Sequence, residues 1–133
     1  MDPERALDLL RHTREVAASH DVNATVAIHD AHGHPVALIR GKRWHGPYMA
    51  QGKARLSAAF AKSTVDLIEQ WSDRPLFPAS LIEIIPGGVT VNPGGVPLFE
   101  DGVCIGAIGV GGSSPDLDHQ IAFEAVSSLG LAK

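Results

Sequence analysis

The chain has 133 residues, a formal net charge of -4 at pH 7 and 11 lysine and arginine residues. This length predicts a single domain, residues 1–133, with a sizeable core. The basic residues form no long run, which argues against nucleic-acid binding, and no apolar segment approaches the ~18 residues of a membrane-spanning helix. Because the N-terminus lacks a signal-peptide core and the single cysteine, Cys104, has no internal partner for a disulfide, we expect a cytoplasmic protein.

The N-terminal segment is typical of an amphipathic helix. Asp2 is an N-cap candidate that precedes Pro3 at the first helical position, and apolar residues recur at helical spacing as far as Ala17. These signals predict a helix over residues 3–19. His12 lies at the edge of the buried stripe, either as a boundary histidine with one nitrogen in water or as a ligand for a metal.

Two strands joined by a polar turn are expected next, over residues 24–30 and 35–40. The spacing of His29, His32 and His34 suggests a metal site. However, structural metal sites usually need four ligands that include thiolates, and these histidines lie in or beside a hairpin turn. We therefore expect no metal there.

The loop from Arg40 to Tyr48 concentrates cations, aromatic rings and a histidine just before a helix. Arg40 and Arg43 suit a carboxylate or phosphate-like group, and the helix that begins near Pro47 adds free amide donors at its N-terminus. The alternative is a solvated basic loop in which Trp44 packs as an anchor.

Lys53 interrupts the apolar stripe of that helix, which also carries Met49, Leu56 and Phe60. Its ammonium must reach solvent, pair with an acid or sit in a pocket, because an isolated charge is costly to bury.

The segment after Thr64 is less regular. Residues 66–71 predict a short helix, and the prolines of residues 72–86 favour an irregular cover with a brief helical turn. Glu83 lies in that cover between two isoleucines, either as a proton-donating acid or as an exposed edge residue.

The stretch from Pro86 to Gly112 organises the chain, because glycine pairs alternate there with apolar residues. Both alternating sets of residues 103–110 are apolar or glycine, which predicts a strand covered on both faces at the centre of a sheet. The tight hairpin turn before it needs a positive φ that a glycine supplies. Gly94 and Gly95 predict a loop that approaches a neighbour or a ligand closely.

A final amphipathic helix is predicted from Ser114-Pro115-Asp116 to about Leu129.

Nucleotide binding and serine hydrolysis are excluded because the chain lacks the motifs that they require. The glycines of residues 106–111 have the wrong order for a dinucleotide fingerprint, and no serine stands in a nucleophile elbow.

Three motifs in chain order resemble the GlcG/HbpS family of haem-degrading or DUF336-like domains: VAIHDAHGHPVALIR, KARLSAAFAKST, and GGVP followed by DG and IGAIGVGG. The resemblance covers nearly the whole chain. It implies a profilin-like three-layer α/β domain that assembles into dimers and larger rings. Combined with the predicted elements, it gives about five mainly antiparallel strands in the order α-β-β-α-β-β-β-α. It also favours a paired or pocket lysine at Lys53, and iron ligation from the first helix through His12.

The resemblance implies two functions, of which we favour ligand binding. In that hypothesis a haem or a small catabolic metabolite lies against the glycine-thinned strands. For haem, a histidine would approach the iron while Arg40, Lys42 or Arg43 would meet the propionates.

The alternative is a cofactor-free lyase that acts on a small aromatic acid such as a hydroxylaminobenzoate. The cations would hold the carboxylate while His45, Tyr48 or Glu83 would move protons. Under either function, Lys53 and the loop of residues 40–48 would form the polar wall of the pocket.

Overall fold

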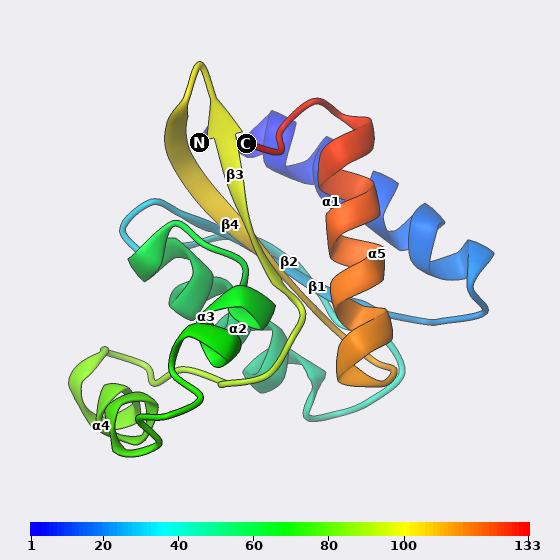
Figure 1. The fold of residues 1–133 in the computed structure, drawn as a ribbon. Helices are drawn as coiled ribbons and strands as arrows, with labels where there is room; N and C mark the ends of the chain where they lie inside the picture. Colours follow the sequence, from blue (N-terminus) through cyan, green and yellow to red (C-terminus); the bar gives the residue numbers. More distant parts are fainter.

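The computed structural model describes all 133 residues as helices and strands arranged in three layers (Figure 1). In chain order the elements are α1 (Pro3–Ser19), β1 (Thr25–Asp30), β2 (Pro35–Ile39), α2 (Gly46–Phe60), α3 (Thr64–Gln70), α4 (Leu76–Ile84), β3 (Gly95–Glu100), β4 (Val103–Gly111) and α5 (Pro115–Ser128). No helix is both long and apolar enough to cross a membrane.

The four strands form one antiparallel sheet in the order β2-β1-β4-β3. The predicted central strand is confirmed, because β4 lies between β1 and β3. The expectation of about five strands is wrong, because the sheet has four and the chain between α4 and β3, residues 85–94, forms turns and loop rather than a further strand. Pro86 and Pro93 in this stretch have no amide hydrogen to donate to a neighbouring strand, which disfavours a strand there.

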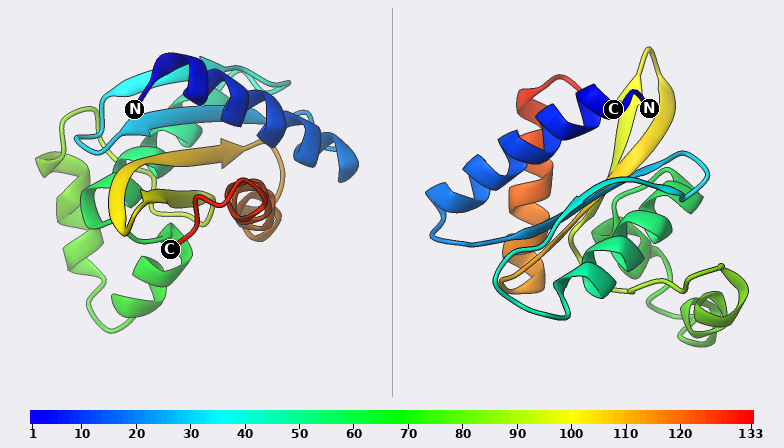
Figure 2. Two further views of the ribbon diagram at one scale, coloured as in Figure 1. Left: turned by 90° about the horizontal axis from the view of Figure 1, so that it is seen from above. Right: turned by 180° about the vertical axis from the view of Figure 1, so that it is seen from behind.

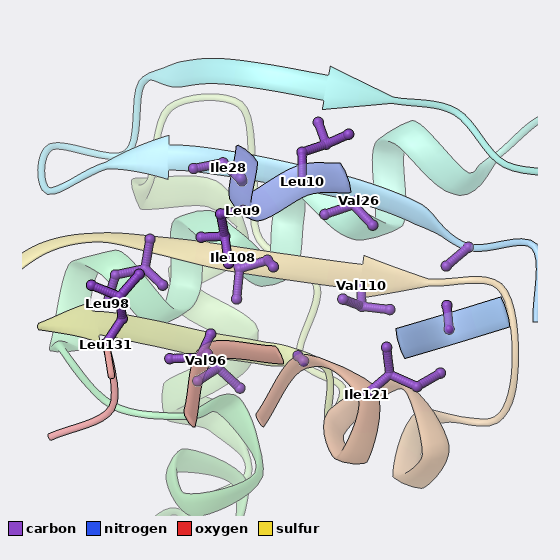
Figure 3. Close-up of a cluster of buried hydrophobic side chains, with 14 of the residues drawn as sticks. Leu9, Leu10, Val26, Ile28, Val96, Leu98, Ile108, Val110, Ile121 and Leu131 are labelled. Carbon is purple, nitrogen blue, oxygen red and sulfur yellow. The ribbon is translucent and has the colours of Figure 1, made fainter. Parts of the chain in front are cut away.

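Helices cover both faces of the sheet. Figure 2 shows α1 and α5 on one face and α2 on the other. The main core lies under α1 and α5, where alternate residues of the strands meet the apolar stripes of the two helices (Figure 3). Its largest members are Leu9, Leu10, Val26, Ile28, Val96, Leu98, Ile108, Val110, Ile121, Val126 and Leu131. A second, smaller cluster formed by Leu56, Leu67, Trp71 and Leu81 holds α2, α3 and α4 together.

On the opposite face of the sheet, glycines without side chains leave room for α2 to lie close to the strands. A Cβ added at Gly109 would overlap the carbonyl oxygen of Ala50, and one added at Gly95 would overlap the carbonyl oxygen of Lys53. Any side chain at these positions would therefore push α2 away from the sheet.

Local signals in the sequence set the ends of the elements. The side chain of Asp2 accepts a hydrogen bond from the amide of Glu4 at the start of α1, and that of Ser114 accepts one from Leu117 at the start of α5. Gly102 has a φ of 78° in the β3–β4 turn, as predicted. The Ser114 cap fixes where α5 begins after β4, which positions the site described next.

Candidate functional site

A polar cavity of about 240 Å³ lies between α2 and the loop that joins β4 to α5. We call it the inner cavity. Arg43 and His45, from the loop before α2, form part of its wall, Ser113 contributes from the β4–α5 loop, and the floor contains Lys53 and Asp118. Met49 is the single hydrophobic residue of the lining, so the cavity suits a small polar molecule.

Lys53 is buried although it carries a charge, with only 3% of its surface exposed. It lies in the middle of α2, on the side that faces the sheet, and its stem passes beside Gly94. Its Nζ donates hydrogen bonds to the carbonyl oxygen of Val110 at 2.9 Å and to Oδ2 of Asp118 at 3.1 Å. The prediction of a paired or pocket lysine thus agrees with this geometry.

Asp118 completes the arrangement from the first turns of α5, where it is 2% exposed. Its Oδ2 receives the bond from Lys53, and its Oδ1 accepts hydrogen bonds from both the amide and the hydroxyl of Ser113, at 3.0 and 2.8 Å. One carboxylate therefore ties α2 to the β4–α5 loop.

The ion pair does not cancel the effect of burial on the lysine. Removal from water lowers the pKa of Lys53 below its usual value, and the nearby negative charge of Asp118 opposes this shift without abolishing it. A lysine in such surroundings is more easily deprotonated than one in solvent.

A second, more open hollow of about 720 Å³ adjoins the inner cavity; we call it the outer hollow. Arg43, His45 and Ser113 border both spaces, whereas Lys42 and Trp44 line only the outer one. The two spaces therefore lie side by side, separated only by residues that border both.

The aromatic rings of the loop contact one another, and of these Trp44 and His45 line the outer hollow. Trp44 is 74% exposed and lies edge-on to His45, with 5.4 Å between the ring centroids. Tyr48 also lies edge-on to Trp44, at 6.4 Å. The indole is thus not the packed anchor of the alternative interpretation.

The predicted residues separate into two groups. Arg43, His45 and Lys53 share the inner cavity, and Trp44 lies beside them. Arg40 and Tyr48 are exposed and line neither space. The structure thus brings Arg43, His45 and Lys53 together, whereas Arg40 and Tyr48 lie apart from them.

Other predicted residues lie elsewhere. Glu83 is exposed on α4, in a helix rather than on a sheet edge. His12 lies on α1 on the other side of the sheet, where its Nε2 is 2.6 Å from the hydroxyl of Ser128. Gly94 and Gly95 are buried, and they accommodate the side chain and backbone of Lys53 rather than line the cavity.

The partners of Lys53, Asp118 and the carbonyl oxygen of Val110, were not predicted from the sequence. Asp118 stands three and four residues before Ile121 and Ala122, on the buried stripe of α5. An acid on one buried stripe and a lysine on another is the signal that could have linked them. Nothing in the sequence marked Ser113 beyond its place in the loop.

The three histidines of the first hairpin do not converge. His29 is buried, with Nδ1 2.8 Å from the carbonyl oxygen of Gly33, whereas His32 and His34 are exposed. No group of three His, Cys, Asp or Glu side chains is placed to hold a metal ion.

A third space, of about 770 Å³, runs beside β3 at the edge of the sheet. Phe60, Phe99 and Phe123 contribute aromatic surface to it, and Lys62 and Lys133 add charge. It contains none of the predicted site residues.

The layered sheet and the inner cavity define a small α/β domain with a polar cavity between α2 and α5. The chain belongs to the HbpS-like family, described as haem-degrading protein HbpS-like, whose model matches residues 1–127. No match was found among curated protein sequences.

Solved structures agree with this assignment. HbpS of Streptomyces reticuli, as a double mutant, is 27% identical, with a TM-score of 0.85 over 98% of this chain and 87% of that one. A PduOC:haem complex is also 27% identical, with a TM-score of 0.84 over 100% and 99% of the two chains. The Klebsiella pneumoniae protein ORFY, at 17% identity, has the same fold, with a TM-score of 0.85 over 100% and 92%.

Proposed function

We propose that this protein binds a small ligand with an anionic group, and that the inner cavity is its binding site. The observation that carries the proposal is the charge of that cavity. Lys53 is neutralised by Asp118, but Arg43 makes no ion pair within the chain and borders the same space. An unpaired guanidinium beside a small polar cavity is suited to a carboxylate or phosphate group.

The family supports binding of this general kind, and haem is a second candidate because one relative was crystallised as a haem complex. The outer hollow holds donors that fit haem: the imidazole of His45 for the iron, and Lys42 and Arg43 for the propionates. Bound there, haem would supply a redox-active iron. The lining is mostly polar, however, and Val22 and Trp44 are its hydrophobic residues, so the geometry favours a small acid.

The expected contribution of His12 to haem binding has little support. His12 borders neither the inner cavity nor the outer hollow nor the space beside β3, and its Nε2 is already engaged with Ser128. His45 is therefore the better iron ligand for haem in this chain.

The lyase alternative has weaker support. Of its three proposed proton-transfer residues, His45 borders the inner cavity, whereas Tyr48 and Glu83 do not. Lys53 and Asp118 would have to replace them.

We also propose self-association, because apolar side chains remain uncovered at one margin of the molecule. Leu76, Ile82 and Ile84 on α4 are 83%, 50% and 69% exposed. Burial of such a patch between copies would remove apolar surface from water. Light scattering at micromolar concentration tests this, and a strictly monomeric mass would contradict it.

Thermal-shift measurements with a panel of small carboxylates, inorganic phosphate and haem test the main proposal. A ligand of the inner cavity should raise the melting temperature of the parent, and Arg43→Met should weaken binding by roughly tenfold or more, as expected for one charge-assisted contact. Lys62→Met, which removes an exposed cation from a different surface, is the matched control. Equal affinities of the parent and Arg43→Met would place the ligand elsewhere.

Haem is tested by titration and absorbance. A Soret band that is lost in His45→Ala but kept in His12→Ala would support haem in the outer hollow. A band that depends on His12 instead would contradict that location.

A further inference from the structure

The amine of Lys53 is placed to react with a ligand as well as to bind it. Resting on the ligand site proposed above, we propose that the inner cavity captures small acids that carry an aldehyde or ketone group, through an imine between their carbonyl carbon and Nζ of Lys53. The ligand class is therefore a 2-oxo acid or an aldehyde acid.

Lys53 differs from every other lysine of the chain. Lys42, Lys62 and Lys133 are exposed, whereas Lys53 is buried and still forms part of the cavity lining. Its Nζ has two acceptors in the protein, Val110 and Asp118, although an ammonium has three hydrogens to donate. The third direction has no protein acceptor.

Imine formation needs the neutral amine, and the surroundings of Lys53 favour it. Burial lowers its pKa, and Asp118, at 3.1 Å, is an adjacent acceptor for the departing proton. Transfer of that proton would replace two buried charges with two neutral groups.

The chemistry balances without a further reactant. The lone pair of the neutral amine attacks the carbonyl carbon, a C–N bond forms, and the carbonyl oxygen takes up a proton to give a carbinolamine. The hydroxyl then leaves with the remaining amine hydrogen as water, and a C=N bond is left. Asp118 and His45 border the cavity and can carry the protons between these atoms. No oxidation or reduction takes place.

The acid group of the ligand has its own partner. Arg43 has no ion pair and lies at the same cavity, so it can hold the carboxylate while the carbonyl meets Lys53. The cavity volume of 240 Å³ corresponds to the space of about eight water molecules at roughly 30 Å³ each. Glyoxylate is small enough to enter it.

Reductive trapping tests the inference. The full chain is incubated with glyoxylate and sodium cyanoborohydride, which reduces an imine to a stable secondary amine, and the labelled lysines are identified by peptide mass spectrometry. We expect Lys53 to be labelled faster than Lys42, Lys62 or Lys133, because its lowered pKa raises the fraction of free amine at a given pH and the cavity holds the acid beside it. Label on the exposed lysines alone would overturn the inference, since a purely structural ion pair makes Lys53 the least accessible of the four.

A variant and a second ligand separate this inference from the binding proposal. Arg43→Met, at an exposed residue, should reduce the labelling of Lys53 by glyoxylate and leave that of the other three lysines unchanged; equal labelling of Lys53 in the variant counts against the carboxylate contact. Glycolate has the same carboxylate but no carbonyl that can condense. If glycolate raises the melting temperature while glyoxylate does not label Lys53, the anion site stands and imine formation is wrong. If glycolate and glyoxylate both leave the melting temperature unchanged and Lys53 is unlabelled, the binding of small acids fails as well.

Discussion

Lys53 and Asp118 form an ion pair with an Nζ–Oδ2 distance of 3.1 Å, and both side chains are at most 4% exposed. The two residues are 65 positions apart in the chain, on helices that pack on different faces of the sheet. The pair reaches past the end of β4, where Val110 accepts a second bond from the lysine. It therefore links the two outer layers at the floor of the proposed ligand site.

This pair predicts a strong coupling in stability. Lys53→Met should destabilise the fold by about 3–5 kcal/mol, because it leaves the carboxylate of Asp118 buried without its cation. Asp118→Asn should also be costly, since it leaves the ammonium unpaired. The double variant should lose less free energy of unfolding than the two single variants together, by about 1–3 kcal/mol. Urea denaturation of the four proteins measures the cycle, and strictly additive losses would show that the pair is not coupled.

Only part of this site could be predicted from the sequence, because local patterns do not specify contacts between distant elements. Helical spacing showed that Lys53 interrupts a buried stripe, and the composition of its preceding loop indicated cations near a ligand. Its partner, Asp118, depends on how α2 and α5 are placed across the sheet, which no local pattern specifies. For Glu83 the sequence left two interpretations open, a proton-donating acid or an exposed edge residue, and α4 leaves both Glu83 and its isoleucine neighbours exposed to solvent.

The fold was more predictable than the site for a related reason. Caps, turns and apolar periodicity act over a few residues, and they located most helix and strand boundaries closely. The segment of residues 72–86 has prolines in place of a clear period. Its helix, α4, is held by the small cluster around Trp71 and Leu81, a tertiary contact that sequence spacing does not reveal.

A second prediction concerns the close approach of α2 to the sheet. Gly109→Ala should destabilise the protein by several kcal/mol or prevent folding, because its Cβ would overlap the backbone oxygen of Ala50 and neither backbone can move cheaply. Gly111→Ala is the matched control: it lies two residues along the same strand, and its Cβ would make an ordinary contact at 3.8 Å. Melting temperatures of the two variants check the prediction, and equal effects would contradict it.

A third prediction concerns the hydrogen bond between α1 and α5. His12→Ala removes the contact with the hydroxyl of Ser128 and should cost about 0.5–1.5 kcal/mol, the usual net value of one such bond. Ser128→Ala should cost a similar amount, and the double variant little more than either alone. Ligand affinity should stay unchanged in all three, because the contact lies on the other side of the sheet from the inner cavity. A loss of ligand affinity in His12→Ala with a normal melting temperature would return His12 to the site.

The last prediction concerns stability in mild acid, through the buried imidazole of His29. Its Nδ1 donates to the carbonyl oxygen of Gly33, so Nε2 is the unprotonated nitrogen, and that atom is buried without a hydrogen-bond partner. Burial, with a smaller contribution from the nearby charge of Arg55, holds the pKa of His29 below 6.5 in the folded protein. Burial also lowers the pKa of His119 on α5.

The sign of the effect follows from proton uptake. As the pH falls below about 6.5, the unfolded chain protonates these histidines while the folded chain does not, so the unfolded state binds more protons and the free energy of unfolding decreases. Each of the two histidines changes the free energy of unfolding by at most about 1.4 kcal/mol per pH unit. The lowered pKa of Asp30 has no influence in this range, because its contribution is lost only as the pH falls through a folded value below 3.8.

Urea denaturation at pH 7.5 and pH 5.0 measures the change. We expect the parent to lose stability on acidification and His29→Gln to lose less, although its stability at pH 7.5 should already be reduced by imperfect packing in place of the ring. His32→Gln, which removes an exposed histidine from the same hairpin, is the matched control and should follow the parent. If His29→Gln and the parent lose the same free energy between the two pH values, the buried imidazole is not the group that senses acid.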